Sequence, residues 1–104
     1  MSRTYSEAFL IELHKANPHR AGIALALACV NANLPAKYVA NALEVTRMTV
    51  FSWFRGKPLR HNNLLKVEVL TDLIESDTAK GLLPARNTKA AKAYLENMVG
   101  REFD

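Results

Sequence analysis

Positively charged side chains gather in one short stretch of this chain, residues 35–60. Its five cations stand against one acid, Glu44, so the stretch carries a net charge of +4, equal to that of the whole 104-residue chain. The cations are Lys37, Arg47, Arg55, Lys57 and Arg60. Lysine and arginine neutralise phosphate groups, and a cluster of them is the usual electrostatic footprint of a nucleic-acid site. The stretch therefore predicts phosphate binding.

Residues for catalysis or metal binding do not fall into a working pattern. The three histidines share no spacing with one another or with the single cysteine that makes a metal site. The step Gly56-Lys57-Pro58 lacks the preceding glycine and the following Ser or Thr of a phosphate-binding loop. Glu68 and Asp72 lie one helical turn apart, which is more typical of an exposed acidic edge than of an acid–base pair. We therefore expect no enzyme, no metal and no cofactor.

The basic stretch is carried by two predicted short helices, at about 36–43 and 47–55, joined by a tight turn. Pro35 suits the opening of the first helix because its missing N–H would be unpaired there anyway. Thr46 is a good N-cap for the second helix, and Gly56 is a typical helix stop. Apolar residues recur at helical spacing in both: Val39, Ala40 and Leu43, then Val50, Trp53 and Phe54. Apolar faces this short predict that the two helices pack on one another.

Residues 34–56 resemble the helix-turn-helix of phage repressors, Cro proteins and their bacterial relatives. The matching positions are Val39, Ala40, Leu43, Val45, Thr46, Val50, Trp53 and Gly56. One position departs from the family, because Glu44 stands where glycine is usual. A left-handed backbone there costs a Glu roughly 1 kcal/mol. A looser resemblance to a five-helix domain runs from about residue 20 to residue 99, and it implies that the second motif helix enters the major groove of DNA.

The resemblance also implies roles for single residues. Carried over by position, the base-reading residues are Arg47 for guanine, Met48 for a thymine methyl, and Ser52 as donor or acceptor. The phosphate-binding candidates are Lys37, Thr49, Arg55, Lys57 and Arg60. Each of these has an ordinary alternative as solvated surface. Phe51 has no place in the scheme, because an exposed phenylalanine is costly unless it meets a base methyl, a sugar or another protein surface.

Four further helices surround the motif. The first, at about 4–16, opens on a capping-box pair, Thr4 and Glu7, and it either covers one side of the core, which we favour, or mediates dimerisation. The helix at about 19–33 is apolar around most of its circumference and belongs in the interior. The last helix, at about 88–99, starts among basic residues that form either a solvated face or a second phosphate contact: Arg86, Lys89 and Lys92.

A long helix at about 61–77 carries the predicted oligomer interface. All but one of its apolar residues fall within an arc of about 200°, which is wider than packing against one small core requires. The part of this arc that the core would not cover includes Val69 and Leu73, and we expect these two residues in a homodimer interface. The opposite edge is acidic and should face away from DNA: Glu68, Asp72 and Glu75.

The length suits one domain, so residues 1–104 are interpreted as a single all-α domain of five to six helices. The longest apolar run is too short to cross a bilayer, and the N-terminus lacks the order of a secretory signal. Cys29 is the only cysteine, so it forms no disulfide within the chain, and its apolar neighbours predict burial. These features favour the cytoplasm of a bacterium or of a phage-infected host cell.

The leading interpretation is a small phage-type transcriptional regulator that binds a specific double-stranded DNA sequence as a homodimer. One alternative keeps DNA binding but assigns it to a packaging subunit (small-terminase-like) or an architectural protein, which would form a ring or filament. Another is a protein–protein interaction module that docks onto RNA polymerase or another protein through exposed Met48, Phe51 and Phe54. Binding that salt does not weaken would favour this last interpretation.

Overall fold

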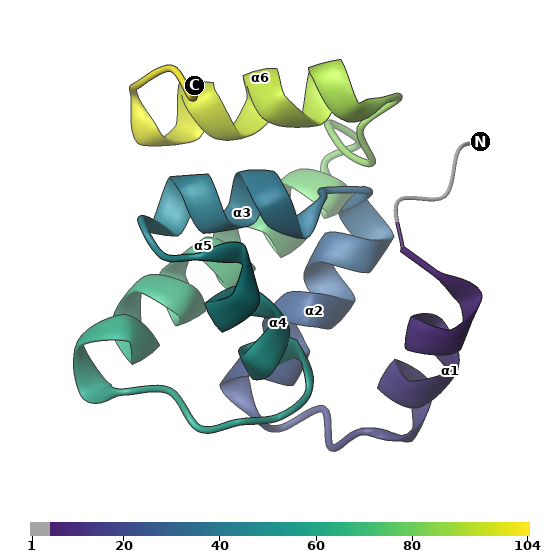
Figure 1. The fold of residues 1–104 in the computed structure, drawn as a ribbon. Coiled ribbons are helices and arrows are strands. Elements are labelled where there is room, and N and C mark those ends of the chain that lie inside the picture. Colours follow the sequence, from purple (N-terminus) through teal and green to yellow (C-terminus); the bar gives the residue numbers. More distant parts are fainter. Residues whose placement is uncertain (1–4) are drawn as a thin grey trace.

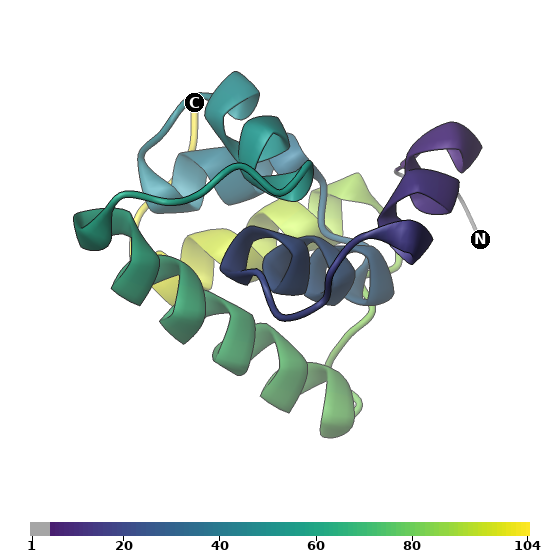
Figure 2. The same ribbon diagram turned by 90° about the horizontal axis from the view of Figure 1, so that it is seen from below.

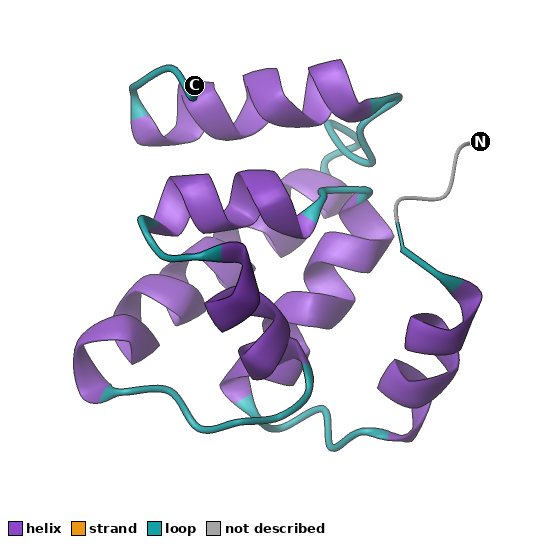
Figure 3. Cartoon of the chain, viewed as in Figure 1, coloured by secondary structure: helices purple, strands orange, loops and turns teal. Residues whose placement is uncertain are grey.

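Six helices joined by loops make up the computed structural model, which describes residues 5–104 (Figure 1, Figure 3). They are α1 (Glu7–Lys15), α2 (Ala21–Ala32), α3 (Ala36–Leu43), α4 (Arg47–Phe54), α5 (His61–Ala79) and α6 (Thr88–Val99). The expected all-α fold of five to six helices is confirmed, and the described residues contain no strand. None of these helices is both long and apolar enough to cross a membrane.

Helix α2 is the central helix, and α1, α4 and α5 all pack against it (Figure 1). Its sequence is apolar on nearly every side, and Ile23, Leu25, Ala26 and Cys29 are almost inaccessible to solvent. Its many alanines are small, so neighbouring helices can approach closely. The predicted interior position of this helix is confirmed, as is the burial of Cys29. Burial raises the pKa of the Cys29 thiol, which therefore stays neutral.

Helix α1 begins later than the predicted start near residue 4. Its N-cap is Ser6, whose hydroxyl accepts a hydrogen bond from the backbone N–H of Phe9 at 3.2 Å. The predicted cap, Thr4, lies outside the described residues. Tyr5 precedes the helix and is buried, with its hydroxyl donating to the carbonyl oxygen of Leu34 at 2.6 Å. This contact ties the entry of α1 to the α2–α3 connection, and α1 covers one side of the core.

Helix α5 divides its wide apolar arc between the core and the surface. Its buried apolar residues face α2 and include Val67, Leu70 and Ile74. A second row of apolar side chains faces solvent: Leu65 is 69% exposed, Val69 49% and Leu73 44%. In Figure 2, α4 lies at one side of the molecule and α5 runs along the other. The helix ends at Ala79 rather than near residue 77, a difference within the usual fraying of helix ends.

Helix α6 lies on α3 (Figure 1), and side chains of the residues that follow α6 also contact α3. Asn87 caps its start, and Gly100 ends it in left-handed backbone with φ 75°, so the predicted bounds of about 88–99 are confirmed. Beyond Gly100, the buried Phe103 stacks on Tyr38 of α3 with 6.4 Å between ring centroids. Its backbone N–H donates to the carboxylate of Glu96 at 2.7 Å. The sequence patterns did not predict this return of the chain.

Candidate nucleic-acid interface

Local hydrogen bonds stabilise the turn between α3 and α4. The hydroxyl of Thr46 accepts from the backbone N–H of Thr49 at 3.1 Å, so Thr46 caps α4 as predicted. Glu44 ends α3 in left-handed backbone with φ 60° and ψ 41°, and its N–H donates to the carbonyl oxygens of Ala40 and Asn41. The residue in the family's glycine position thus adopts the glycine-like conformation, at a steric cost of roughly 1 kcal/mol.

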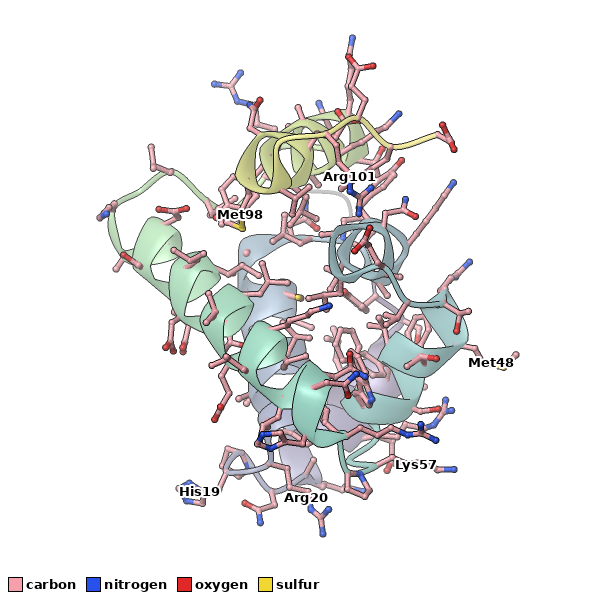
Figure 4. The ribbon with its side chains drawn as sticks, turned by 90° about the vertical axis from the view of Figure 1, so that its left-hand side faces the viewer. His19, Arg20, Met48, Lys57, Met98 and Arg101 are labelled. Atoms are coloured by element: carbon pink, nitrogen blue, oxygen red, sulfur yellow. The ribbon has the colours of Figure 1, made fainter. Side chains whose placement is uncertain are left out.

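The C-terminal segment reinforces this turn from outside. The guanidinium of Arg101 donates to the carbonyl oxygen of Asn41, and it lies 3.9 Å from the carboxylate of Glu44. Figure 4 shows Arg101 between α6 and α3. The ion pair is exposed and contributes little by itself, so the hydrogen bond to the backbone is the more important contact. Arg101 therefore helps to hold the end of α3 in position for α4.

Helix α4 is held against α2 at very short distance. Val50 and Trp53 are buried, which confirms their predicted core positions, and Phe54 is buried beside them. At Gly22 of α2, a Cβ atom would stand 2.3 Å from the carbonyl oxygen of Trp53 and 2.9 Å from its Cβ. Gly22 therefore sets how deeply α4 sits. Sequence reasoning missed it, although a glycine inside an alanine-rich apolar helix is a signal of close packing.

The face of α4 opposite its buried residues is open to solvent. At about 100° per residue, Met48, Ser52 and Arg55 lie at the centre of that face, with Arg47 on its flank. Met48 is 78% exposed, Arg47 and Arg55 are exposed, and Ser52 is half-buried. Figure 4 shows Met48 and Lys57 projecting from the same side of the molecule. The structure thus brings the three predicted base-reading residues onto one surface.

The predicted phosphate-binding residues differ in how free their side chains are. Four are exposed cations, and within the described part of the chain none of them lies at ion-pair distance from a carboxylate: Lys37, Arg55, Lys57 and Arg60. Thr49 is half-buried, and its hydroxyl lies 2.8 Å from that of Thr46, with which it shares a hydrogen bond. The four cations are therefore available to an anion, whereas the Thr49 hydroxyl already takes part in the cap of α4.

The loop after α4 is tied down by a residue that sequence reasoning missed. Arg20 precedes α2, and its guanidinium donates to the carbonyl oxygen of Gly56 at 2.9 Å. Gly56 has φ 95°, which suits glycine and lets the chain leave α4 sharply. Figure 4 shows Arg20 and Lys57 at the same end of the molecule. No pattern near residue 20 indicates this contact, because its acceptor lies 36 residues further on.

The aromatic residues of α4 correct one interpretation of the sequence. Phe54 is only 2% exposed and Phe51 is half-buried. The Phe51 ring meets the Phe9 ring of α1 edge-on, with 6.2 Å between centroids, and the Phe54 ring at 5.9 Å. Helix α1 thus supplies the protein surface that Phe51 needs. The predicted exposed trio for docking a protein partner is wrong, since Met48 alone of the three is exposed.

The wider comparisons give no match. No protein-family model, curated protein or solved structure matches this chain. The interpretation of α4 as a DNA-binding element therefore stays a prediction, which depends on the sequence pattern and on the exposure and charge of the residues around α4.

A second surface of interest is an apolar groove between α3, α5 and α6. Both predicted interface residues line it, together with the other outward residue of α5 and the end of α6: Val69, Leu73, Leu65, Met98 and Val99. Figure 4 shows Met98 between the ribbons of α5 and α6. The acidic residues Glu68, Asp72 and Glu75 are exposed along the neighbouring edge of α5. The groove brings the exposed apolar row of α5 beside the end of α6, the helix that the sequence offered as a second element of the interface.

Proposed function

We propose that this protein binds double-stranded DNA at specific sequences, as a small transcriptional regulator of phage type. The observation that carries the proposal is the outward face of α4, where Arg47, Met48 and Ser52 stand on a helix anchored by the buried Val50 and Trp53. An α-helix with its side chains is about 10–12 Å across, which the major groove of B-DNA admits. The proposed activity is binding alone, in the cytoplasm of a bacterium or an infected host cell.

The side chains on α4 suit the edges of base pairs. Arg47 has a fork of donors for the O6 and N7 acceptors of guanine, which is the commonest specific contact in the major groove. Met48 offers an exposed apolar side chain for a thymine methyl, and the hydroxyl of Ser52 can donate or accept. These three residues would read bases, and the surrounding cations would fix the protein on the backbone.

The charges around α4 support backbone contacts. Lys37, Arg55, Lys57 and Arg60 are exposed and have no carboxylate partner among the described residues, so a phosphate meets no competing acid. Positive charge of this kind supplies the sequence-independent part of the affinity and makes it sensitive to salt. The acidic residues Glu68, Asp72 and Glu75 lie on α5, whereas the cations lie on α3, at the end of α4 and in the loop after it. DNA bound at α4 would therefore meet the cations and not the acidic edge.

A homodimer completes the proposal. One copy extends 31 Å at most, and its single eight-residue α4 contacts only a few base pairs. Tight specific binding normally uses two such helices placed about 34 Å apart, one turn of DNA. The outward apolar row of α5 and the groove beside it are the surface that we assign to the dimer.

Selection from a random pool of duplex DNA by the purified protein tests this function. We expect enrichment of one sequence motif. Arg47→Ala should keep the melting temperature and lose about 1–3 kcal/mol for the selected site, with relaxed preference at one base position per half-site. Trp53→Ala is the matched control, because emptying this buried position costs about 3–5 kcal/mol of folding stability and lowers binding only through unfolding.

Two results would contradict the proposal in different ways. If no sequence is enriched and the protein has no affinity for duplex DNA, the function is wrong. If Arg47→Ala weakens binding to all sequences equally, Arg47 is a phosphate contact and its assigned base-reading role is wrong.

A further inference from the structure

We propose that α1 is part of the DNA-reading apparatus, because Phe9 and Phe51 position the guanidinium of Arg47. This inference rests on the function proposed for α4. It gives α1 a role beyond covering the core, and it makes Phe9 and Phe51 positioning residues that act through Arg47 without touching a base.

We call the series of contacts from Tyr5 and Phe9 through Phe51 to Arg47 the aromatic relay. Its last contact joins Phe51 to Arg47. The guanidinium carbon of Arg47 lies over the Phe51 ring, 5.6 Å from its centroid. The two residues are four apart on one helix and therefore share a face. Arg47 is exposed and stands on the flank of the outward face, so its long side chain would otherwise sample many rotamers. A ring beneath the guanidinium narrows that choice through a cation–π interaction.

The Phe51 ring is itself held in place by other rings. It meets Phe9 at an interplanar angle of 90° and Phe54 at 79°. Both are edge-to-face arrangements, which aromatic quadrupoles favour. Phe9 in turn stacks on Tyr5, with 5.3 Å between ring centroids. The hydroxyl of Tyr5 donates a hydrogen bond to the carbonyl oxygen of Leu34. A continuous series of contacts thus runs from the α2–α3 connection through α1 to Arg47.

The consequence for binding is preorganisation. A side chain that already occupies a restricted set of rotamers loses less entropy when it pairs with a base. The relay also fixes Arg47 on the α1 side of the outward face, so the base that it reads lies on that side of Met48. Cutting the relay should therefore weaken the reading of one base position and leave the phosphate contacts unchanged.

The contact can first be measured in the free protein by NMR. Protons of the Arg47 side chain near the Phe51 ring should show upfield ring-current shifts. Phe51→Leu should abolish the shifts and Phe9→Leu should reduce them, whereas Phe51→Tyr should keep them. Phe103→Leu is the matched control: the guanidinium of Arg101 lies over the Phe103 ring at 5.3 Å, but this pair belongs to the segment after α6, which contacts Tyr38 of α3 rather than α4. Unshifted Arg47 protons in the wild type would overturn the proposal.

The second measurement is a double-mutant cycle on the DNA site selected by the wild type. Phe51→Leu should weaken binding to that site about two- to fivefold, the range of an exposed cation–π contact, with no change in the salt dependence. It should reduce the base preference at the same position of the site at which Arg47→Ala reduces it. In an Arg47→Ala background, Phe51→Leu should have no further effect. Phe51→Tyr should restore binding, and Phe103→Leu should leave the base preference intact.

The outcomes separate this inference from the function on which it rests. A wild type without affinity for duplex DNA removes the function, and the inference with it. A wild type that selects a sequence, combined with a Phe51→Leu loss that persists in the Arg47→Ala background, overturns the positioning role alone. Phe51 would then only stabilise the fold.

Discussion

Gly22 of α2 lies directly against the backbone of Trp53 in α4, so that a Cβ atom at residue 22 would stand 2.3 Å from the Trp53 carbonyl oxygen and 2.7 Å from its carbonyl carbon. The two nearest atoms belong to the main chain of α4 at the buried Trp53, and they cannot move aside as the end of a flexible side chain can. The depth of α4 in the fold, and with it the height of Met48 above the surface, depends on this glycine.

The first prediction is that Gly22→Ala destabilises the protein. Overpacking of a tight contact costs about 1–3 kcal/mol, which exceeds the roughly 1 kcal/mol that alanine gains over glycine inside a helix. Urea denaturation should show a lower midpoint. Gly81→Ala is the control, because no atom lies within 4 Å of a Cβ there and only the strain of φ 82° applies. A Gly22→Ala protein more stable than the wild type would show that α2 and α4 can separate freely.

The second prediction concerns the strained turn, where Glu44→Asn should raise the stability. Asparagine tolerates the left-handed region better than Glu, and it adds none of the unfolded-state freedom of glycine. The gain should reach several tenths of a kcal/mol and at most about 1 kcal/mol. The contact with Arg101 is exposed and its loss costs little. Glu44→Ala removes the same charge but keeps the strain, so thermal melting should show no comparable gain for it.

The third prediction is a steep salt dependence of DNA binding. With four to eight phosphate contacts per dimer, log K should fall against log salt with a slope of about −4 to −7. Arg55→Ala and Lys57→Ala should each reduce the steepness by about one unit per contact removed from each protomer. Lys80→Ala, at the end of α5, should leave the slope unchanged. Titrations between low and moderate salt measure it, and a flat response would remove the footprint assigned to residues 35–60.

The fourth prediction is that Val69→Asp or Leu73→Asp dissociates a homodimer without unfolding the chain. Both side chains are nearly half exposed in one copy, so an aspartate there stays in contact with water. Leu70→Asp is the contrasting control, because Leu70 is buried and a charge there should unfold the domain. Sedimentation and circular dichroism distinguish the two effects. A wild type that is monomeric at tens of micromolar contradicts the dimer, and a larger ring would instead favour the packaging interpretation.

Local signals in the sequence were sufficient for the helices of the motif. Thr46 could be assigned as an N-cap because its hydroxyl needs only the N–H of Thr49, three residues away. Helical periodicity likewise identified Val50 and Trp53 as core residues, and the alanine-rich run as an interior helix. The left-handed backbone at Glu44 was suggested by the family resemblance, in which glycine is usual at this turn position. Each of these features depends on residues within one or two helical turns of each other.

The tertiary structure decided what the sequence patterns left open. Phe51 had no assigned place until α1 was seen to cover it, and Phe54 was taken as exposed until it was found in the core. Gly22, Arg20 and Arg101 gave no local indication of their partners. The physical reason is that close packing and side-chain to backbone hydrogen bonds join residues far apart in the chain, and they depend on how whole helices fit together. The sequence by itself determined which segments are helical and which faces are apolar, whereas the docking of α1, α2 and α6 determined which side chains of the motif remain on the surface.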